Sequence, residues 1–419
     1  MAAPVLRLCL CQKAHIVVES IAFNFTMHSD TYLFFLGSHP ALSFLELEQV
    51  CGRYEQTVSL LLPSVAKCQW AGGLPENLID RLGGVDRIVR VVGTYGSVPE
   101  AGDILSALPM QKLTLGLSFY GSDMDLQPLA EKLKGLARKR GVKLRFVLPK
   151  DARGQLNAAQ IMFNKLDRKR NSEVTIIPAG EVFFLTRTTQ VQDIRAYEIR
   201  DTSRPARHGK VGMLSPKLAQ MMINIAVGGL KAPTIFDPFC GMGTILQEGR
   251  LMGLPTTGSD ISSEMVHATR QNLEHLERHF RLQNDPRPEV FQHDATRSFP
   301  ARLYGQFDAI VTEPHLGRAL TTPLPHREVD RAVAKLRALY RTAFKRFSLT
   351  LKPGGRVLFL LPAFRQGRRF TLFPASFLDE IESLQYRKVQ LQDRADMLYA
   401  RPGALVGREL TLWERNNGT

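Results

Sequence analysis

A glycine-bearing loop framed by two acids is the segment of this chain with the clearest chemical potential. Residues 234–262, TIFDPFCGMGTILQEGRLMGLPTTGSDIS, are typical of a strand, a tight turn, a helix and a second strand. Gly241 and Gly243 let the backbone pass close to a ligand because they carry no Cβ. Asp237 ends the first strand and Asp260 ends the second, where nucleotide-binding folds hold a ribose diol. The loop therefore predicts a nucleoside-containing ligand.

The acids also indicate which ligand fits. A dinucleotide loop carries G-x-G-x-x-G and binds a pyrophosphate, whereas this loop reads D-P-F-C-G-M-G-T and its aspartate would repel phosphates. S-adenosylmethionine carries an ammonium and a sulfonium and no phosphate, so an acidic loop suits it. Asp294, in VFQHDATR, follows another predicted strand, where it can accept a hydrogen bond from an adenine amino group. We expect S-adenosyl-L-methionine as the cofactor, which leaves a dehydrogenase as a remote alternative. The candidate cofactor residues in these segments are Asp237, Phe239, Cys240, Gly241, Gly243, Thr244, Asp260, Ile261, Asp294 and Ala295.

The elements that must position these residues alternate between strand and helix. After the loop come a buried strand in FDAIVTEP, a long helix over 328–349, a turn and strand in LKPGGRVLFLLP, and closing strands in the tail. Ser215 and Pro216 are typical of the start of a helix ahead of the loop. This alternation predicts an α/β domain with a mainly parallel sheet over residues 213–419.

The N-terminal half has a different organisation. Short strands and helices predict an α+β unit of ferredoxin-like type and then a second α+β unit. PENLIDRLGGVDRIVRVVG is read as a helix followed by a strand, and VQDIRAYEIRDTSRPARHGKVG as a basic connector in which Pro205 and Gly209 disfavour a continuous helix. Regular patterning begins just after Met27, which makes it a candidate for the true start. The expected boundaries are a flexible extension over 1–27, the two units over 28–110 and 111–190, and a linker over 191–212.

Positive charge is abundant and clustered. The chain has 419 residues, and its 55 lysines and arginines against 40 acids give a formal net charge of +15. Composition alone fits a polyanion partner and an ordinary basic protein equally well, but the clustering favours a phosphate-contacting surface. Asp151 and Asp167 are the only acids between the cluster's first and last members. We call this set of lysines and arginines the basic cluster. Its members are Lys132, Lys134, Arg138, Lys139, Arg140, Lys143, Arg145, Lys150, Arg153, Lys165, Arg168, Lys169 and Arg170.

The five cysteines and the apolar segments indicate a cytoplasmic protein. Five cysteines in so long a chain do not make a disulfide framework, and Cys9 and Cys11 have no second pair at zinc-site spacing, so we expect no metal. No apolar run reaches the roughly 20 residues that a membrane span needs. We therefore expect no membrane partner.

Several motifs together resemble one known family. YLFFLGSHPALSFLELEQV, LGLSFYG, RDTSRPARHGKVGMLSPKLAQMMINIA, DPFCGMGT, GSDI and YARPGALVGREL are similar to segments of THUMP-containing RNA guanine-N2 methyltransferases, in the tRNA branch that modifies guanosine at position ten. The resemblance covers about residues 30–415. It implies a ferredoxin-like unit, a THUMP domain over 111–190 that grips the tRNA acceptor end, and a class I Rossmann-fold methyltransferase domain. Met213 and Leu214 match the place where the family packs its connector near the cofactor.

The family's catalytic motif, Asp-Pro-Pro-Tyr after the fourth strand, is altered here. The matching positions are Glu313, Pro314, His315 and Leu316, in TEPHLG, and these are the candidate catalytic residues. An exocyclic amine is a weak nucleophile, because its lone pair is delocalised into the ring. A carboxylate and a backbone carbonyl that accept its N–H groups localise that lone pair. Glu313 keeps the carboxylate with a longer reach, while Leu316 removes the aromatic ring that would stack on an extruded base and leaves His315 as a substitute.

Three readings of function follow from these residues. The first is a methyltransferase that forms N2-methylguanosine in tRNA, near position ten. The second is a related enzyme that acts on another structured RNA, such as the guanine N2 of ribosomal RNA. The third is an RNA-binding protein that holds the cofactor but whose catalysis the EPHL motif has altered. Single or double methylation, a small partner subunit and the oligomeric state stay open.

Overall fold

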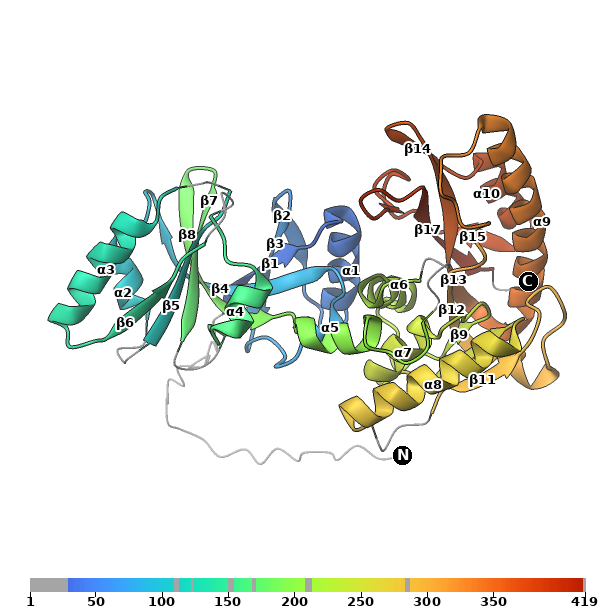
Figure 1. Ribbon diagram of the computed structural model, residues 1–419, viewed down its shortest axis with the longest axis horizontal. Coiled ribbons are helices and arrows are strands. Elements are labelled where there is room, and N and C mark those ends of the chain that lie inside the picture. Colours follow the sequence, from blue (N-terminus) through green and yellow to red (C-terminus); the bar gives the residue numbers. More distant parts are fainter. Residues whose placement is uncertain are drawn as a thin grey trace, which may run out of the picture.

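The fold consists of two sheets joined through helices. The computed structural model describes residues 29–108, 113–121, 124–149, 154–167, 171–207, 213–282 and 287–416. One sheet belongs to the N-terminal half, blue to green in Figure 1, and the other to the C-terminal half, yellow to red. The predicted extension over 1–27 lies outside the described residues. In the part of the chain that is described, no helix is both long and apolar enough to cross a membrane.

The N-terminal sheet has eight strands in the order β2-β3-β1-β4-β8-β7-β5-β6. Antiparallel pairing of β4 with β8 places the strands of both predicted α+β units in this one sheet. The elements are β1 (Ser29–Leu36), α1 (Pro40–Gly52), β2 (Val58–Leu62), β3 (Val65–Ala71), η1 (Ile79–Arg81), β4 (Val85–Tyr95), α2 (Ala101–Ser106), β5 (Leu113–Phe119), α3 (Gln127–Lys139), β6 (Leu144–Val147), α4 (Ala158–Phe163), β7 (Ser172–Ala179) and β8 (Val182–Val191).

Two local expectations differ from the structure. The helix expected in PENLIDRLGG is only the short 3₁₀ turn η1, because the amides of Gly83 and Gly84 donate to the buried carboxylate of Glu46 instead of continuing a helix. The expected linker contains the helix α5 (Ile194–Asp201), whose N-cap Asp193 accepts hydrogen bonds from two amides of the first turn. This helix ends before Pro205, as the proline predicts.

The C-terminal sheet follows the order β11-β10-β9-β12-β13-β17-β15, with β14 beside β13 and β16 beside β17. The strands from β11 to β13 are parallel, and β17 returns antiparallel to β13. The elements are α6 (Pro216–Val227), β9 (Ile235–Asp237), α7 (Thr244–Leu251), β10 (Thr256–Asp260), α8 (Ser263–Phe280), β11 (Glu289–Gln292), η2 (Ala301–Leu303), β12 (Phe307–Thr312), α9 (His326–Thr350), β13 (Leu351–Gln366), β14 (Arg369–Thr371), α10 (Ala375–Glu382), β15 (Tyr386–Lys388), β16 (Leu398–Tyr399) and β17 (Val406–Arg415).

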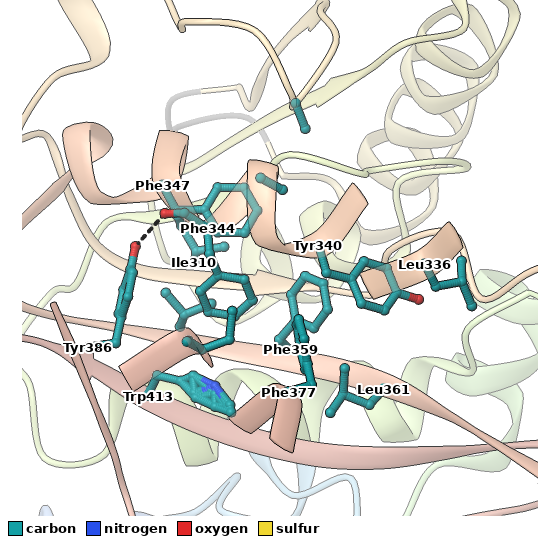
Figure 2. Close-up of a cluster of buried hydrophobic side chains, with 14 of the residues drawn as sticks. Ile310, Leu336, Tyr340, Phe344, Phe347, Phe359, Leu361, Phe377, Tyr386 and Trp413 are labelled. Atoms are coloured by element: carbon teal, nitrogen blue, oxygen red, sulfur yellow. Dashed lines mark hydrogen bonds between the residues drawn. The ribbon is translucent and has the colours of Figure 1, made fainter. Parts of the chain in front are cut away.

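Both faces of this parallel sheet are buried. Successive strand residues point to opposite faces, so Leu358 packs with α6 and α7 while Phe359 packs with α9 and α10. Figure 2 shows the aromatic cluster on the α9 side, where Tyr340 and Phe344 meet Phe359. This core holds the carboxyl ends of the parallel strands rigidly in place.

The two halves are joined by buried polar contacts around α1 and α6. Glu46 accepts a hydrogen bond from Asn224 Nδ2 at 2.8 Å in addition to those from Gly83 and Gly84. The ring of His39 stacks on Tyr399, with centroids 4.2 Å apart. Burial raises the pKa of Glu46 to about 7, so this junction is sensitive to pH near neutrality.

Candidate active site

The candidate site lies at the carboxyl ends of three neighbouring parallel strands. β10, β9 and β12 are adjacent in the sheet, and each is followed by a segment with a predicted site residue. Ligands in open α/β sheets bind at this edge. A cavity of about 960 Å³ opens there, large enough for a nucleoside cofactor together with a second group. Four acids line it: Asp237 ends β9, Asp260 ends β10, Glu313 follows β12, and Asp294 follows β11 beside β10.

Asp237 is a buried acid at the end of β9. Its Oδ1 accepts hydrogen bonds from the Thr312 hydroxyl at 2.7 Å and from the Phe239 amide at 3.1 Å. The pKa of Asp237 is raised to about 7, mainly by burial and less by the nearby carboxylates of Asp260 and Glu313, against the lowering effect of the two hydrogen bonds. A cation that entered the cavity would offset this penalty on the charged form.

The loop after β9 is held in shape by Asp260 and Thr269. Asp260 Oδ2 accepts the Gly241 amide at 3.0 Å, and the Thr269 hydroxyl donates to the Gly241 carbonyl at 2.7 Å. Gly243 caps α7 with φ +80°, and a Cβ there would lie 2.6 Å from Thr269 Cγ2. Both the backbone angle and the close neighbour therefore require glycine.

Asp294 lies in the cavity wall that follows β11. Its Oδ1 accepts the Thr296 amide at 2.9 Å and the Thr296 hydroxyl at 2.7 Å, and these bonds lower the pKa of its carboxyl. The exposed side chain of Ile261 and the buried Ala295 provide apolar surface in the same cavity. A charged acceptor beside apolar walls suits an adenine, which has both a flat apolar face and an amino group.

The connector reaches the cavity through Met213 and Leu214, which line it as the resemblance implied. Arg204 links the connector to the loop, because its Nη1 donates to the Thr244 hydroxyl at 3.0 Å and its Nη2 contacts Met213 Sδ at 3.2 Å. Arg204 of the connector therefore contacts two residues of the cavity wall.

The EPHL segment follows β12 on the same side of the sheet. The Glu313 side chain is 15% exposed and is paired with Arg408 of β17, whose Nε donates to Oε1. The hydroxyl of the buried Tyr340 donates to the His315 carbonyl at 2.7 Å and ties the segment to the aromatic core of Figure 2. His315 is exposed at the cavity, and Pro314 and Leu316 also line it.

The structure brings the sequence-predicted residues together in this one cavity. Gly243 alone among them is absent from its walls, since it supports the loop from behind as the cap of α7. The sequence reasoning missed the wall formed by Gly403, Ala404, Leu405, Val406 and Arg408. YARPGALVGREL had contributed to the family resemblance, and that match was the signal that could have pointed to this wall.

The family comparison concerns the C-terminal half. A family model described as RMKL-like, methyltransferase domain, matches residues 203–370. This part of the chain is therefore similar to a methyltransferase domain. The match agrees with the α/β methyltransferase fold predicted for this half of the chain.

Relatives of the methyltransferase domain agree with the resemblance seen in the motifs. The tRNA (guanine(10)-N2)-dimethyltransferase of Methanothermobacter thermautotrophicus is 38% identical over 152 residues, which cover 36% of this chain and 39% of the relative. The enzyme of the same name from Pyrococcus abyssi is 29% identical over 202 residues, or 47% of this chain and 48% of the relative. The chain thus spans less than half the length of these curated relatives.

One solved structure resembles most of the chain. TrmN from Thermus thermophilus has a TM-score of 0.51 and 18% sequence identity, and the match covers 92% of this chain and 99% of that one. At this identity the likeness concerns the fold alone.

Proposed function

We propose that this protein methylates the exocyclic N2 amine of a guanine in tRNA, with S-adenosyl-L-methionine as methyl donor. The observation that carries the proposal is the meeting of Glu313 with the acidic cofactor loop in one cavity of the methyltransferase domain. The names of the two relatives support guanine N2 in tRNA as the target. The net charge of +15 supports a polyanionic substrate.

The cavity residues fit the cofactor by their chemistry. When bound, S-adenosyl-L-methionine supplies a methyl group on a positively charged sulfur. Asp237 compensates positive charge near the loop, Asp260 holds the loop and faces the place of the ribose, and Asp294 accepts a hydrogen bond from the adenine amino group. Cys240, Gly241 and Thr244 leave room for the ligand between the loop and α7.

The target base would enter from the side of the EPHL segment. In this proposal Glu313 accepts one N–H of the amine and the backbone carbonyl of Pro314 accepts the other, so that the lone pair is directed at the methyl group. His315 stacks on the extruded base in place of the missing aromatic residue at Leu316. The apolar wall of Leu405 and Val406 excludes water from the reacting atoms.

A second candidate is a cofactor-holding RNA-binding protein that has lost methyl transfer. The ion pair between Glu313 and Arg408 favours it, because the carboxylate already has a partner. The proposal also includes a cytoplasmic location, the domain boundaries given above, and THUMP-type binding of the tRNA acceptor end by residues 111–190.

Incubation of the full chain with labelled S-adenosyl-L-methionine and bulk tRNA tests the proposal. We expect N2-methylguanosine among the nucleosides separated by mass spectrometry, and its mono- or dimethylated form reports the degree of methylation. Glu313→Gln should lose on the order of 100-fold in kcat while its cofactor affinity is retained. Arg394→Gln, at an ion pair outside the cavity, is the control.

The outcomes separate the readings. Product on ribosomal RNA but not on tRNA would favour the ribosomal enzyme. Cofactor and tRNA binding without any methylated nucleoside would favour the second candidate.

A further inference from the structure

Arg408 is the cationic side chain that pairs with the proposed acceptor acid, and no motif reasoning assigned it a role. It lies in β17, which pairs antiparallel with β13. Since β13 separates β17 from β12, Arg408 reaches Glu313 at the end of β12 from two strands away. The Arg408 side chain is 11% exposed and that of Glu313 is 15% exposed. In a pair held this far from water, removal of one partner leaves the other charge uncompensated in a poorly solvated place.

We propose that Arg408 is a positioning residue, which holds the longer Glu313 side chain so that its carboxylate meets the target amine at the cavity. This inference rests on the proposed function of the site. A carboxylate has about four lone-pair positions, so a bond to Arg408 leaves capacity for an N–H of the substrate. The extra methylene of glutamate adds a rotatable bond, and an anchor on β17 restricts it.

Charge is the second part of this role. An ionised carboxylate accepts hydrogen bonds with both oxygens and donates none, whereas protonation turns one oxygen into a donor. Burial raises the pKa of Glu313, and Arg408 lowers it both through its charge and through its hydrogen bond. The other charged or titratable groups facing Glu313 are Arg401, which lowers the pKa further, and Asp237 and Tyr340. Loss of Arg408 therefore leaves Glu313 protonated to higher pH.

The neighbouring pair of Arg394 and Glu409 offers a matched control. Glu409 follows Arg408 in β17, and successive strand residues point to opposite faces. Its side chain is 1% exposed and accepts from Arg394, and neither residue lines the cavity. Arg394→Gln thus removes the partner of a buried glutamate of the same strand without changing a residue that lines the cavity.

The test compares Arg408→Gln, Arg408→Lys and Arg394→Gln by kcat against pH for methyl transfer to tRNA. Arg408→Gln should lose on the order of 100-fold in kcat and move the acid limb of the profile to higher pH. Arg408→Lys should keep the acid limb near its wild-type position, because the charge remains, but should still lose kcat. The KM for tRNA and the cofactor Kd should stay unchanged in all three.

Two further measurements make the outcome decisive. In a Glu313→Gln background, Arg408→Gln should cause no additional loss of kcat, since it acts through Glu313. Carbon-13 NMR with carboxyl-labelled glutamate, assigned by Glu313→Gln, should show the Glu313 titration moving to higher pH in Arg408→Gln and staying in place in Arg394→Gln.

An unchanged pH profile and an unchanged Glu313 titration in folded Arg408→Gln would overturn the proposal. If Arg408→Gln does not fold, Arg408→Lys decides, and a kcat equal to that of the wild type rejects the positioning role. If the wild type transfers no methyl group to any RNA, the proposed function fails separately, and the NMR titration alone decides whether Arg408 controls Glu313.

Discussion

Asp237 is buried and Glu313 is partly buried, both face the same cavity, and each has its own partner. Asp237 is held by the Thr312 hydroxyl and the Phe239 amide, whereas Glu313 is held by Arg408. The negative charge of Glu313 repels that of Asp237 across the poorly solvated cavity, and this repulsion contributes to the raised pKa of Asp237. Arg408 already compensates the charge of Glu313, whereas a cationic ligand would compensate that of Asp237, so the ionisation of Asp237 couples to cofactor binding.

Cofactor affinity should therefore depend on pH through Asp237. Its pKa is about 7 in the free protein, so the carboxylate becomes charged as pH rises from about 6 to about 8 and attracts the cationic cofactor more strongly. We expect the Kd to fall over this range in isothermal titration calorimetry. Asp237→Asn should bind more weakly and show a flatter dependence on pH. A wild-type Kd that rises with pH would contradict this assignment.

At the scale of elements, the cofactor loop depends on the junction of β9, α7 and α8. Gly243 ends the loop in the left-handed region with φ +80°, directly against Thr269 of α8. The hydroxyl of that threonine holds the Gly241 carbonyl. A shift of α8 at this point would consequently alter the loop itself.

Gly243→Ala should destabilise the protein and weaken cofactor binding. The new Cβ would lie 2.6 Å from Thr269 Cγ2, so we expect a loss of about 2 kcal/mol or more in the free energy of unfolding. Gly253→Ala is the matched control, because its φ is +72° but no atom lies within 4 Å of the new Cβ. That variant should lose only about 1 kcal/mol, from the left-handed backbone alone. Equal losses in urea denaturation would show that the contact with Thr269 does not matter.

The junction of α1 with α6 is a second place where elements depend on one side chain. Glu46 has a pKa of about 7 in the folded protein against 4.5 as its ordinary value, so the folded state keeps a proton that the unfolded chain has lost. The free energy of unfolding should fall as pH rises from about 4.5 to about 7. Asp237 and Glu248, also raised to about 7, act in the same direction.

Glu46→Gln should remove the Glu46 part of this dependence. The difference in unfolding free energy between pH 5 and pH 8 should shrink by on the order of 3 kcal/mol relative to the wild type. Urea denaturation at both pH values measures it, with the exposed Glu55→Gln as control. An unchanged difference would rule out Glu46 as a titrating group at this junction.

At the scale of the whole molecule, the basic cluster lies away from the cavity. Figure 1 shows α3 at the end of the N-terminal sheet remote from the methyltransferase domain. Lys132, Lys134, Arg138, Lys139 and Arg140 on and beside α3 are exposed, as are Lys143, Arg145 and Lys165. Lys150, Arg153, Arg168, Lys169 and Arg170 lie outside the described residues. An RNA that reaches from α3 to the cavity would bind the basic cluster through its phosphates and place a distant base in the cavity.

A triple variant of Lys132, Arg138 and Lys139 to glutamine should weaken tRNA binding without changing the cofactor Kd. The slope of log affinity against log salt should become shallower by about 0.9 for each phosphate that the variant no longer neutralises. A filter-binding salt series measures this slope. Glutamine at Arg331, Lys335 and Lys345, exposed cations of α9, is a control of equal charge change. An equal effect of both triple variants would point to net charge instead of a specific surface.

Local sequence determined the cofactor loop, because its chemistry is contained in one strand-turn-helix segment. Asp237, Gly241 and Asp260 were recognisable from their residue types and their positions at strand ends, and β9, α7 and β10 form where the pattern predicts them. Ser215 caps α6 as predicted, since a cap and its target amide are three residues apart. The long helix and the strands around it follow from periodicity in the same way.

The tertiary structure alone decided the partners of these residues. Arg408 reaches Glu313 from 95 residues away in the chain, and Glu46 reaches Asn224 from 178 residues away, and no local pattern encodes either pair. The helix expected near Ile79 is only a 3₁₀ turn because Glu46 on α1 binds the Gly83 and Gly84 amides. Sheet order brings β9, β10 and β12 together, and burial at that edge then raises the pKa of Asp237 and Glu313. The sheet order and the pKa shifts both depend on how segments far apart in the chain pack together, and the spacing of residues along the sequence does not specify that packing.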